Sequence, residues 1–69
     1  MEKKMIIDGM KCNHCRMTVE KALMGVEGVI KAEADLESRT AVITLERDVD
    51  DQVLMNAVAA KDFTPVKML

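Results

Sequence analysis

The sequence predicts an α+β domain in which strands and helices follow one another in the order β-α-β-β-α-β. Three observations predict it: four short segments alternate apolar and polar residues, two longer segments repeat apolar residues with helical spacing, and glycines or short polar runs separate them. The chain has 69 residues, which suffice for one domain and leave no room for a second. We therefore treat residues 1–69 as a single domain.

The first half of the chain predicts a strand followed by a helix. The strand covers residues 3–8, and Gly9 ends it. The helix begins near Asn13 or His14, and Gly25 and Gly28 lie where a helix end is expected. The apolar stripe of this helix consists of Cys15, Val19, Ala22, Leu23 and Val26.

A β-hairpin is predicted next, with strands over residues 29–36 and 40–46. The polar residues 37–39 form a connection short enough to join antiparallel neighbours. The first of these strands is expected to place one alternating set of side chains on the inner face: Ile30, Ala32, Ala34 and Leu36. The second strand is expected to do the same with Ala41, Ile43 and Leu45.

The last third of the chain predicts a second helix and a closing strand. Aspartates within residues 48–51 supply N-cap carboxylates, and the helix continues through about Ala60. Its inward face is expected to carry Val53, Leu54, Ala57 and Val58. The strand over residues 64–68 contains Pro65, which suits the edge of a sheet. Two β-α-β units of this size give the ferredoxin-like plan, a four-stranded antiparallel sheet with both helices on one face.

Size and charge exclude several classes of function. A 69-residue domain has no room for a catalytic cleft with substrate, cofactor and lid, so we expect a binding module and no enzyme. Ten Lys and Arg against twelve Asp and Glu give a net charge of −2, which is no footprint for nucleic acid. The first apolar run ends at Asp8, short of the roughly 7–15 residues of a signal peptide core. We expect a cytoplasmic chain that does not insert into a membrane.

Residues 9–15, with the sequence GMKCNHC, contain both cysteines of the chain. A disulfide across so short a loop gains little chain entropy and is disfavoured in a reducing cytosol. A closed zinc site needs four ligands, and the motif offers two cysteines with a single histidine between them. A thioredoxin-type redox site uses the same spacing but belongs to a longer chain. The fourth interpretation is an open site of two thiolates.

An open dithiolate site suits a soft ion, because thiolates select Cu(I) over hard cations. Two metal–sulfur bonds of about 2.3 Å span roughly 4.6 Å. Side chains three apart at a helix start lie roughly 5–6 Å apart, so Cys12 and Cys15 can reach one ion. We expect Lys11, Arg16 and the helix N-terminus to lower the pKa of the cysteines and to favour thiolates.

The motif Gly-Met-x-Cys-x-x-Cys resembles the signature of the heavy-metal-associated domain family, and its Cys-x-His-Cys form is most similar to bacterial copper chaperones. The likeness covers nearly the whole chain, including the element order. It implies that Cys12 and Cys15 bind one Cu(I) and pass it by thiolate exchange to a partner CxxC. The partners it implies are a copper-transporting P-type ATPase or a copper-responsive regulator, and a metal-bridged homodimer is compatible with it.

The resemblance also assigns roles around the motif. Met10 is expected to be a core residue beneath the loop, and Phe63 is expected to shield the bound ion. Asp62 stands where the family usually has glycine, which leaves its effect on the site open. His14 is expected to be exposed and to modulate release at most. Of the seven methionines, Met5, Met10 and Met55 are expected to pack in the core, and the other four are expected to be partly exposed with no role assigned: Met1, Met17, Met24 and Met68.

Three other interpretations stay open. The same thiols also suit Hg(II), Zn(II) or Ag(I), so the chain could handle another metal. It could equally be an excised N-terminal module of a P-type metal ATPase. A small dithiol redox protein is the third interpretation, and it belongs to a different class of function.

Overall fold

The computed structural model describes residues 1–69 and contains the six elements in the predicted order. These are β1 (Glu2–Asp8), α1 (Asn13–Met24), β2 (Val29–Asp35), β3 (Thr40–Leu45), α2 (Asp51–Ala59) and β4 (Thr64–Met68). The strand ends lie within one residue of those expected. Neither helix is long and apolar enough to cross a membrane.

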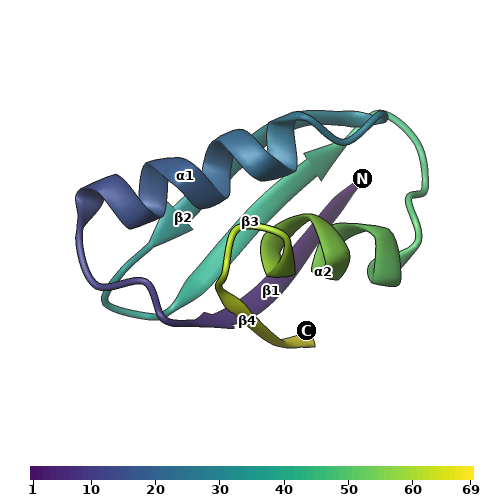
Figure 1. The fold of residues 1–69 in the computed structure, drawn as a ribbon. Coiled ribbons are helices and arrows are strands. Elements are labelled where there is room, and N and C mark those ends of the chain that lie inside the picture. Colours follow the sequence, from purple (N-terminus) through teal and green to yellow (C-terminus); the bar gives the residue numbers. More distant parts are fainter.

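The four strands form one antiparallel sheet in the order β2-β3-β1-β4. Both helices cover the same face of this sheet (Figure 1). β2 and β3 form the predicted hairpin, and β4 with Pro65 lies at an edge. The predicted ferredoxin-like fold is confirmed.

An aliphatic core fills the space between the sheet and the helices. Its twelve buried residues are Met5, Ile7, Met10, Val19, Leu23, Ala32, Ala41, Ile43, Leu45, Val49, Leu54 and Val58. Two of them are methionines, and Met55 and Met68 pack against the cluster while half-buried. The expected core positions of Met5 and Met10 are confirmed, and Met55 packs against the core while half-buried.

Two residues expected in the core are exposed instead. Ile30 is 54% exposed because the register shifts there: Val29 lies opposite Leu45 and Lys31 opposite Thr44, so Ile30 falls outside the alternation. Val53 is 46% exposed because α2 turns its Leu54 face to the sheet. Both predictions were wrong, since sequence periodicity shows neither a bulge nor the rotation of a helix about its own axis.

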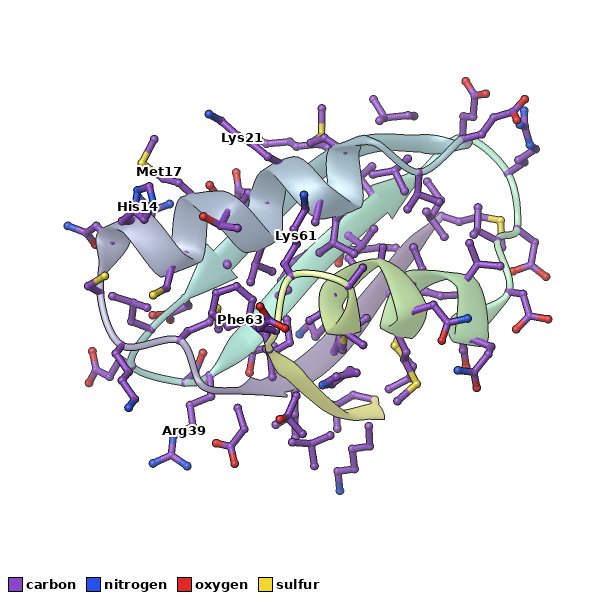
Figure 2. The ribbon with its side chains drawn as sticks, in the orientation of Figure 1. His14, Met17, Lys21, Arg39, Lys61 and Phe63 are labelled. Atoms are coloured by element: carbon purple, nitrogen blue, oxygen red, sulfur yellow. The ribbon has the colours of Figure 1, made fainter.

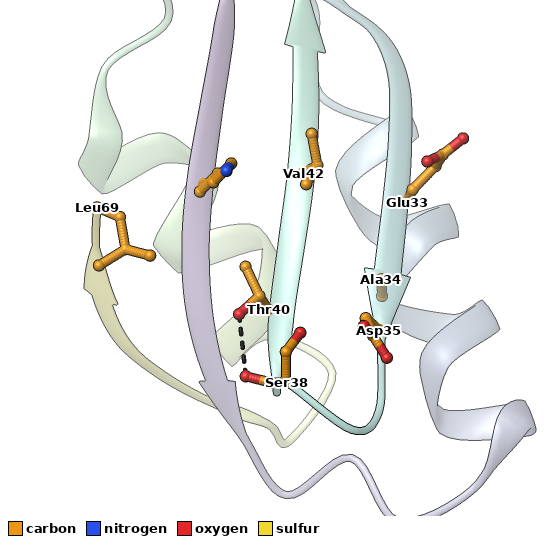
Figure 3. A pocket seen from close by; sticks show the side chains of 8 residues that line it. Glu33, Ala34, Asp35, Ser38, Thr40, Val42 and Leu69 are labelled. Atoms are coloured by element: carbon orange, nitrogen blue, oxygen red, sulfur yellow. Dashed lines mark hydrogen bonds between the residues drawn. The ribbon is translucent and has the colours of Figure 1, made fainter.

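The other face of the sheet carries no helix (Figure 1). A shallow groove crosses this face beside the β2–β3 turn, where the Thr40 hydroxyl donates to the Ser38 carbonyl at 3.0 Å (Figure 3). Val42, Glu33 and the C-terminal Leu69 line it. It contains none of the candidate site residues, which lie at one end of the layer between sheet and helices.

Candidate metal site

The cysteine motif forms the connection from β1 to α1. Gly9 turns the chain with a φ of +99°, in the left-handed region that glycine adopts without strain. Met10 then inserts its side chain into the core and is only 9% exposed. The buried Met10 side chain therefore anchors the loop to the core, and the residues that follow it, Lys11 and Cys12, lie at the surface.

The two cysteines lie together at the start of α1. Cys12 is the N-cap residue, with an extended backbone, and Cys15 is in the first turn. Their Sγ atoms are 3.5 Å apart, and both thiols are free. Cys12 is exposed, whereas Cys15 is half-buried and packs against the core. Two sulfurs that hold one ion between them lie roughly 4.6 Å apart, so the two Sγ atoms must separate by about 1 Å to bind it.

The surroundings of Cys15 lower the pKa of its thiol. The main cause is a hydrogen bond from the Lys11 backbone, followed by one from the Cys12 thiol. The Cys12 backbone and the positive charge of Lys11 contribute less, and partial desolvation opposes them. The helix start thus favours a thiolate at Cys15, which is the form that binds metal.

Arg16 does not take part in this effect, contrary to expectation. Its Nη1 donates to Oε2 of Glu20 at 2.9 Å, one helical turn away. The same carboxylate oxygen accepts the backbone N–H of Ala34 at 2.8 Å. Glu20 therefore holds the guanidinium and fastens α1 to the free edge of β2. The spacing of Arg16 and Glu20 indicates their ion pair, but nothing local in the sequence indicates the contact with Ala34.

Phe63 lies beside the loop, as the resemblance implied. It sits in the connection between α2 and β4 (Figure 2), half-buried and packed against the core. A Cβ placed on Gly9 would be 3.6 Å from its Cδ1 atom, so the ring covers the start of the motif. Asp62 precedes it with a φ of +67°, a conformation that favours glycine.

His14 lies in the first turn of α1, next to Cys15 in the sequence. It projects from the outer side of α1 near Met17 and is exposed (Figure 2). Its backbone carbonyl accepts from the Thr18 hydroxyl at 2.9 Å, and its ring makes no hydrogen bond or ion pair. No group of three or more His, Cys, Asp or Glu side chains gathers anywhere in the chain. The site therefore offers two thiols and no third ligand of these types.

A ferredoxin-like fold with two adjacent thiols at an exposed helix start defines a small metal-binding domain. The heavy-metal-associated domain family matches residues 4–61, and the chain belongs to this family.

Relatives of known name fall into two groups. The copper chaperone CopZ of Staphylococcus haemolyticus is 36% identical over 75% of the chain and 91% of its own length. The mercuric reductase of Acidithiobacillus ferrooxidans is 40% identical over 87% of the chain. The periplasmic component of a mercuric transport protein from Pseudomonas aeruginosa is 45% identical over 58% of the chain. The chain spans only 11% of the reductase and 44% of the transport protein.

Solved structures that resemble this chain include a copper chaperone and a copper-binding domain of an ATPase. A CopZ metallochaperone superposes with a TM-score of 0.90 at 25% identity, covering 96% of the chain and all of that protein. A copper-binding domain from HMA7, a P-type ATPase, superposes with a TM-score of 0.90 at 28% identity, covering 99% of the chain and 92% of that domain. The resemblance to copper chaperones thus extends over almost the full length of both chains.

Proposed function

We propose that this domain binds one Cu(I) through Cys12 and Cys15 and passes it to a matching CxxC site on a partner. The observation that carries the proposal is the pair of free thiols 3.5 Å apart at an exposed helix start. Thiolates favour Cu(I), and the lowered pKa of Cys15 supplies one of them. The likeness to copper chaperones over nearly the whole of their length supports the same metal.

The different exposure of the two cysteines supports a stepwise transfer. A partner thiolate reaches the ion from the side of the exposed Cys12 and adds a third sulfur to it. The bond to Cys12 then breaks, and a second partner thiolate displaces Cys15. The ion stays Cu(I) throughout, no electron moves, and each sulfur that leaves takes up the proton that its replacement gave up. No covalent bond of a substrate changes, so the domain is not an enzyme.

The partner we propose is a copper-transporting P-type ATPase or a copper-responsive regulator that carries its own CxxC. The structural likeness to a copper-binding domain of a P-type ATPase supports such a partner, because domains of the same shape can face each other with their thiols. Transfer in the cytoplasm and a copper-bridged homodimer are compatible with an open two-thiol site. Phe63 beside Gly9 covers one side of the loop and would limit access of water to the ion.

Hg(II) is the second candidate metal, because two relatives are named for mercury and the same two thiols suit it. Zn(II) is less well served, since no cluster of three His, Cys, Asp or Glu side chains is present. A copper-binding module of a longer ATPase fits the same geometry.

Competition titration with a Cu(I) chelator tests the proposal. The unmodified chain should remove one equivalent of Cu(I) from the chelator, and Cys12→Ser and Cys15→Ala should each fail to do so. Thr18→Ala is the matched control, because Thr18 lies in the next turn of α1 and its hydroxyl donates to the His14 backbone carbonyl. An affinity of Cys15→Ala equal to that of the unmodified chain would contradict the proposal. Tighter binding of Hg(II) than of Cu(I) in the same assay would favour mercury instead.

A further inference from the structure

Three methionines of this chain lie outside the core. Met1 is 64% exposed, Met17 46% and Met24 48%. Met17 and Met24 both belong to α1, and about half of each residue is exposed. A thioether outside the core contributes less to stability than a buried one, but it is a soft ligand with a sulfur lone pair.

Met17 differs from Met24 in its neighbour one turn earlier. His14 lies three residues before Met17, and Figure 2 shows both side chains on the outer side of α1 near its start. The residue three positions before Met24 is Lys21, which has no lone pair to donate when protonated. Of two similarly exposed methionines, one therefore follows a possible nitrogen ligand by one helical turn, and the other does not.

The spacing of His14 and Met17 suits one metal ion. Residues three apart on a helix have Cβ atoms about 5–6 Å apart. Metal bonds of about 2.1 Å to imidazole and about 2.3 Å to sulfur span roughly 4.4 Å together. The His14 ring makes no hydrogen bond in the chain, so a ring nitrogen is free to bind.

We propose that His14 and Met17 form a second, weaker site for a soft monovalent cation, Cu(I) or Ag(I), on the outer side of α1. Thioether and imidazole select such ions, whose filled d shell accepts two ligands. Binding is weaker than at a dithiolate because both ligands are neutral, and Lys21 one turn beyond Met17 adds a like charge. This site is separate from the two thiols and stands whether or not they carry copper.

The test is an NMR titration with silver nitrate, since Ag(I) is diamagnetic and stays monovalent. After the first equivalent, further Ag(I) should shift the Met17 methyl and the His14 ring signals together and to saturation. The Met24 methyl should stay unchanged, although it is equally exposed. In Met17→Leu the His14 response should be lost, and in the matched control Met24→Leu it should be retained.

The Cys12→Ser/Cys15→Ser chain separates this inference from the proposed function. It should lose the first equivalent and keep the second, with the same shifts at His14 and Met17. Equal responses of Met17 and Met24, or a His14 response that survives Met17→Leu, would overturn the second site. If the unmodified chain did not bind copper tightly, the proposed function would be overturned, but the site at His14 and Met17 would still stand. Because all four substituted side chains lie at least partly at the surface, circular dichroism should show the fold unchanged.

Discussion

The two helices of this domain begin in opposite ways. α2 has a carboxylate at its start: Asp50 accepts the backbone N–H of Gln52 at 2.9 Å, and Asp51 pairs with Lys3 at 2.6 Å. α1 begins at Cys12, whose side chain caps nothing, and no acidic residue follows in its first turn. The start of α1 thus carries no side-chain cap, and the Lys11 and Cys12 backbone just before the helix hydrogen-bonds the Cys15 thiol, whereas the start of α2 is capped for stability.

The two ends of the molecule differ in packing as well. At the far end, Gly28 is buried, and its carbonyl accepts the backbone N–H of Glu46 at 2.9 Å. Lys3 closes this end by donating to the Val49 carbonyl at 2.7 Å. At the cysteine end, Gly9 is exposed. One end of the domain is therefore built tightly, and the other leaves a loop at the surface.

The largest expected effect comes from replacing the two turn glycines by alanine. Gly28 has a φ of +97°, and a Cβ there would lie 2.9 Å from Cγ2 of Val49. Gly28→Ala should lower the free energy of unfolding by about 2–4 kcal/mol, from left-handed strain plus overpacking. Gly9→Ala has similar strain, but its Cβ would meet Phe63 at an ordinary 3.6 Å, so about 1–2 kcal/mol is expected.

Urea unfolding of both variants measures this difference. If Gly9→Ala cost as much as Gly28→Ala, the cysteine end would be packed as tightly as the far end, and the comparison would fail. Gly25→Ala is the control, because Gly25 has a negative φ and its nearest neighbours lie at ordinary distances.

Substitutions at the two N-cap positions, Asp50 and Cys12, are expected to have the next largest effects on stability, and these effects should have opposite signs. Asp50→Ala removes the side-chain cap of α2 and should destabilise the chain by about 1 kcal/mol. Cys12→Ser places a hydroxyl at the uncapped start of α1, where the extended backbone suits an N-cap, and should stabilise it by about 0.5–1 kcal/mol.

Thermal unfolding of the metal-free chains reports both signs, with Cys12→Ala as the matched control that adds no cap. If both Cys12→Ser and Cys12→Ala were less stable than the unmodified chain, the thiol itself would stabilise the helix start. The expected result would mean that α1 gives up stability to keep its two thiols.

A smaller effect is expected at Asp62, in the connection that carries Phe63. Its φ of +67° is strained for any residue with a Cβ, and its side chain is exposed. Asp62→Gly should therefore stabilise the chain by about 0.5–1 kcal/mol, once the greater freedom of glycine in the unfolded chain is subtracted. Chemical denaturation measures it, and a loss of stability would mean that the carboxylate makes a favourable interaction.

Much of the fold could be predicted because the spacing of apolar residues along each segment indicates the element and its buried face. Met5 and Ile7 alternate in β1, and Val19 and Leu23 repeat in α1, so each element and its buried face follow from neighbouring residues. The paired cysteines are equally local, because three residues and a helix start suffice to bring them together. Glycine at residue 9 likewise indicates the turn before them.

The missed features depend on segments far apart in the sequence. Ile30 is displaced by the register between β2 and β3, and Glu20 reaches Ala34 across the edge of the sheet. The position of Phe63 beside Gly9 followed from family resemblance, since no local pattern joins the two connections. Charge was misjudged in the same way: Arg16 is next to Cys15 in sequence, but Glu20 holds its guanidinium.

The smallest expected effect concerns the thiolate of Cys15 and sharpens the comparison of the two helix starts. Because the pKa of Cys15 is lowered in the folded chain, its alkylation by iodoacetamide should reach half its maximal rate at a lower pH than in the unfolded chain. The same shift makes stability depend on pH. The stability that the Cys15 thiolate contributes is fully present above the pKa of Cys15 in the unfolded chain. It is lost as the pH falls through the lower pKa of Cys15 in the folded chain.

Cys12→Ser makes Cys15 the only thiol and keeps a hydroxyl donor beside it, so it is the background for this measurement. Adding Lys11→Ala removes the side-chain charge but keeps the backbone donor, which is the main cause of the lowered pKa of Cys15. The midpoint should therefore rise only slightly, and Lys21→Ala, which contributes nothing to that pKa, should leave it in place. If Lys11→Ala alone restored the midpoint of the unfolded chain, the charge of Lys11 and not the backbone of Lys11 and Cys12 would favour the thiolate. The contrast between an α1 start kept for thiols and an α2 start used for stability would then lose its physical basis.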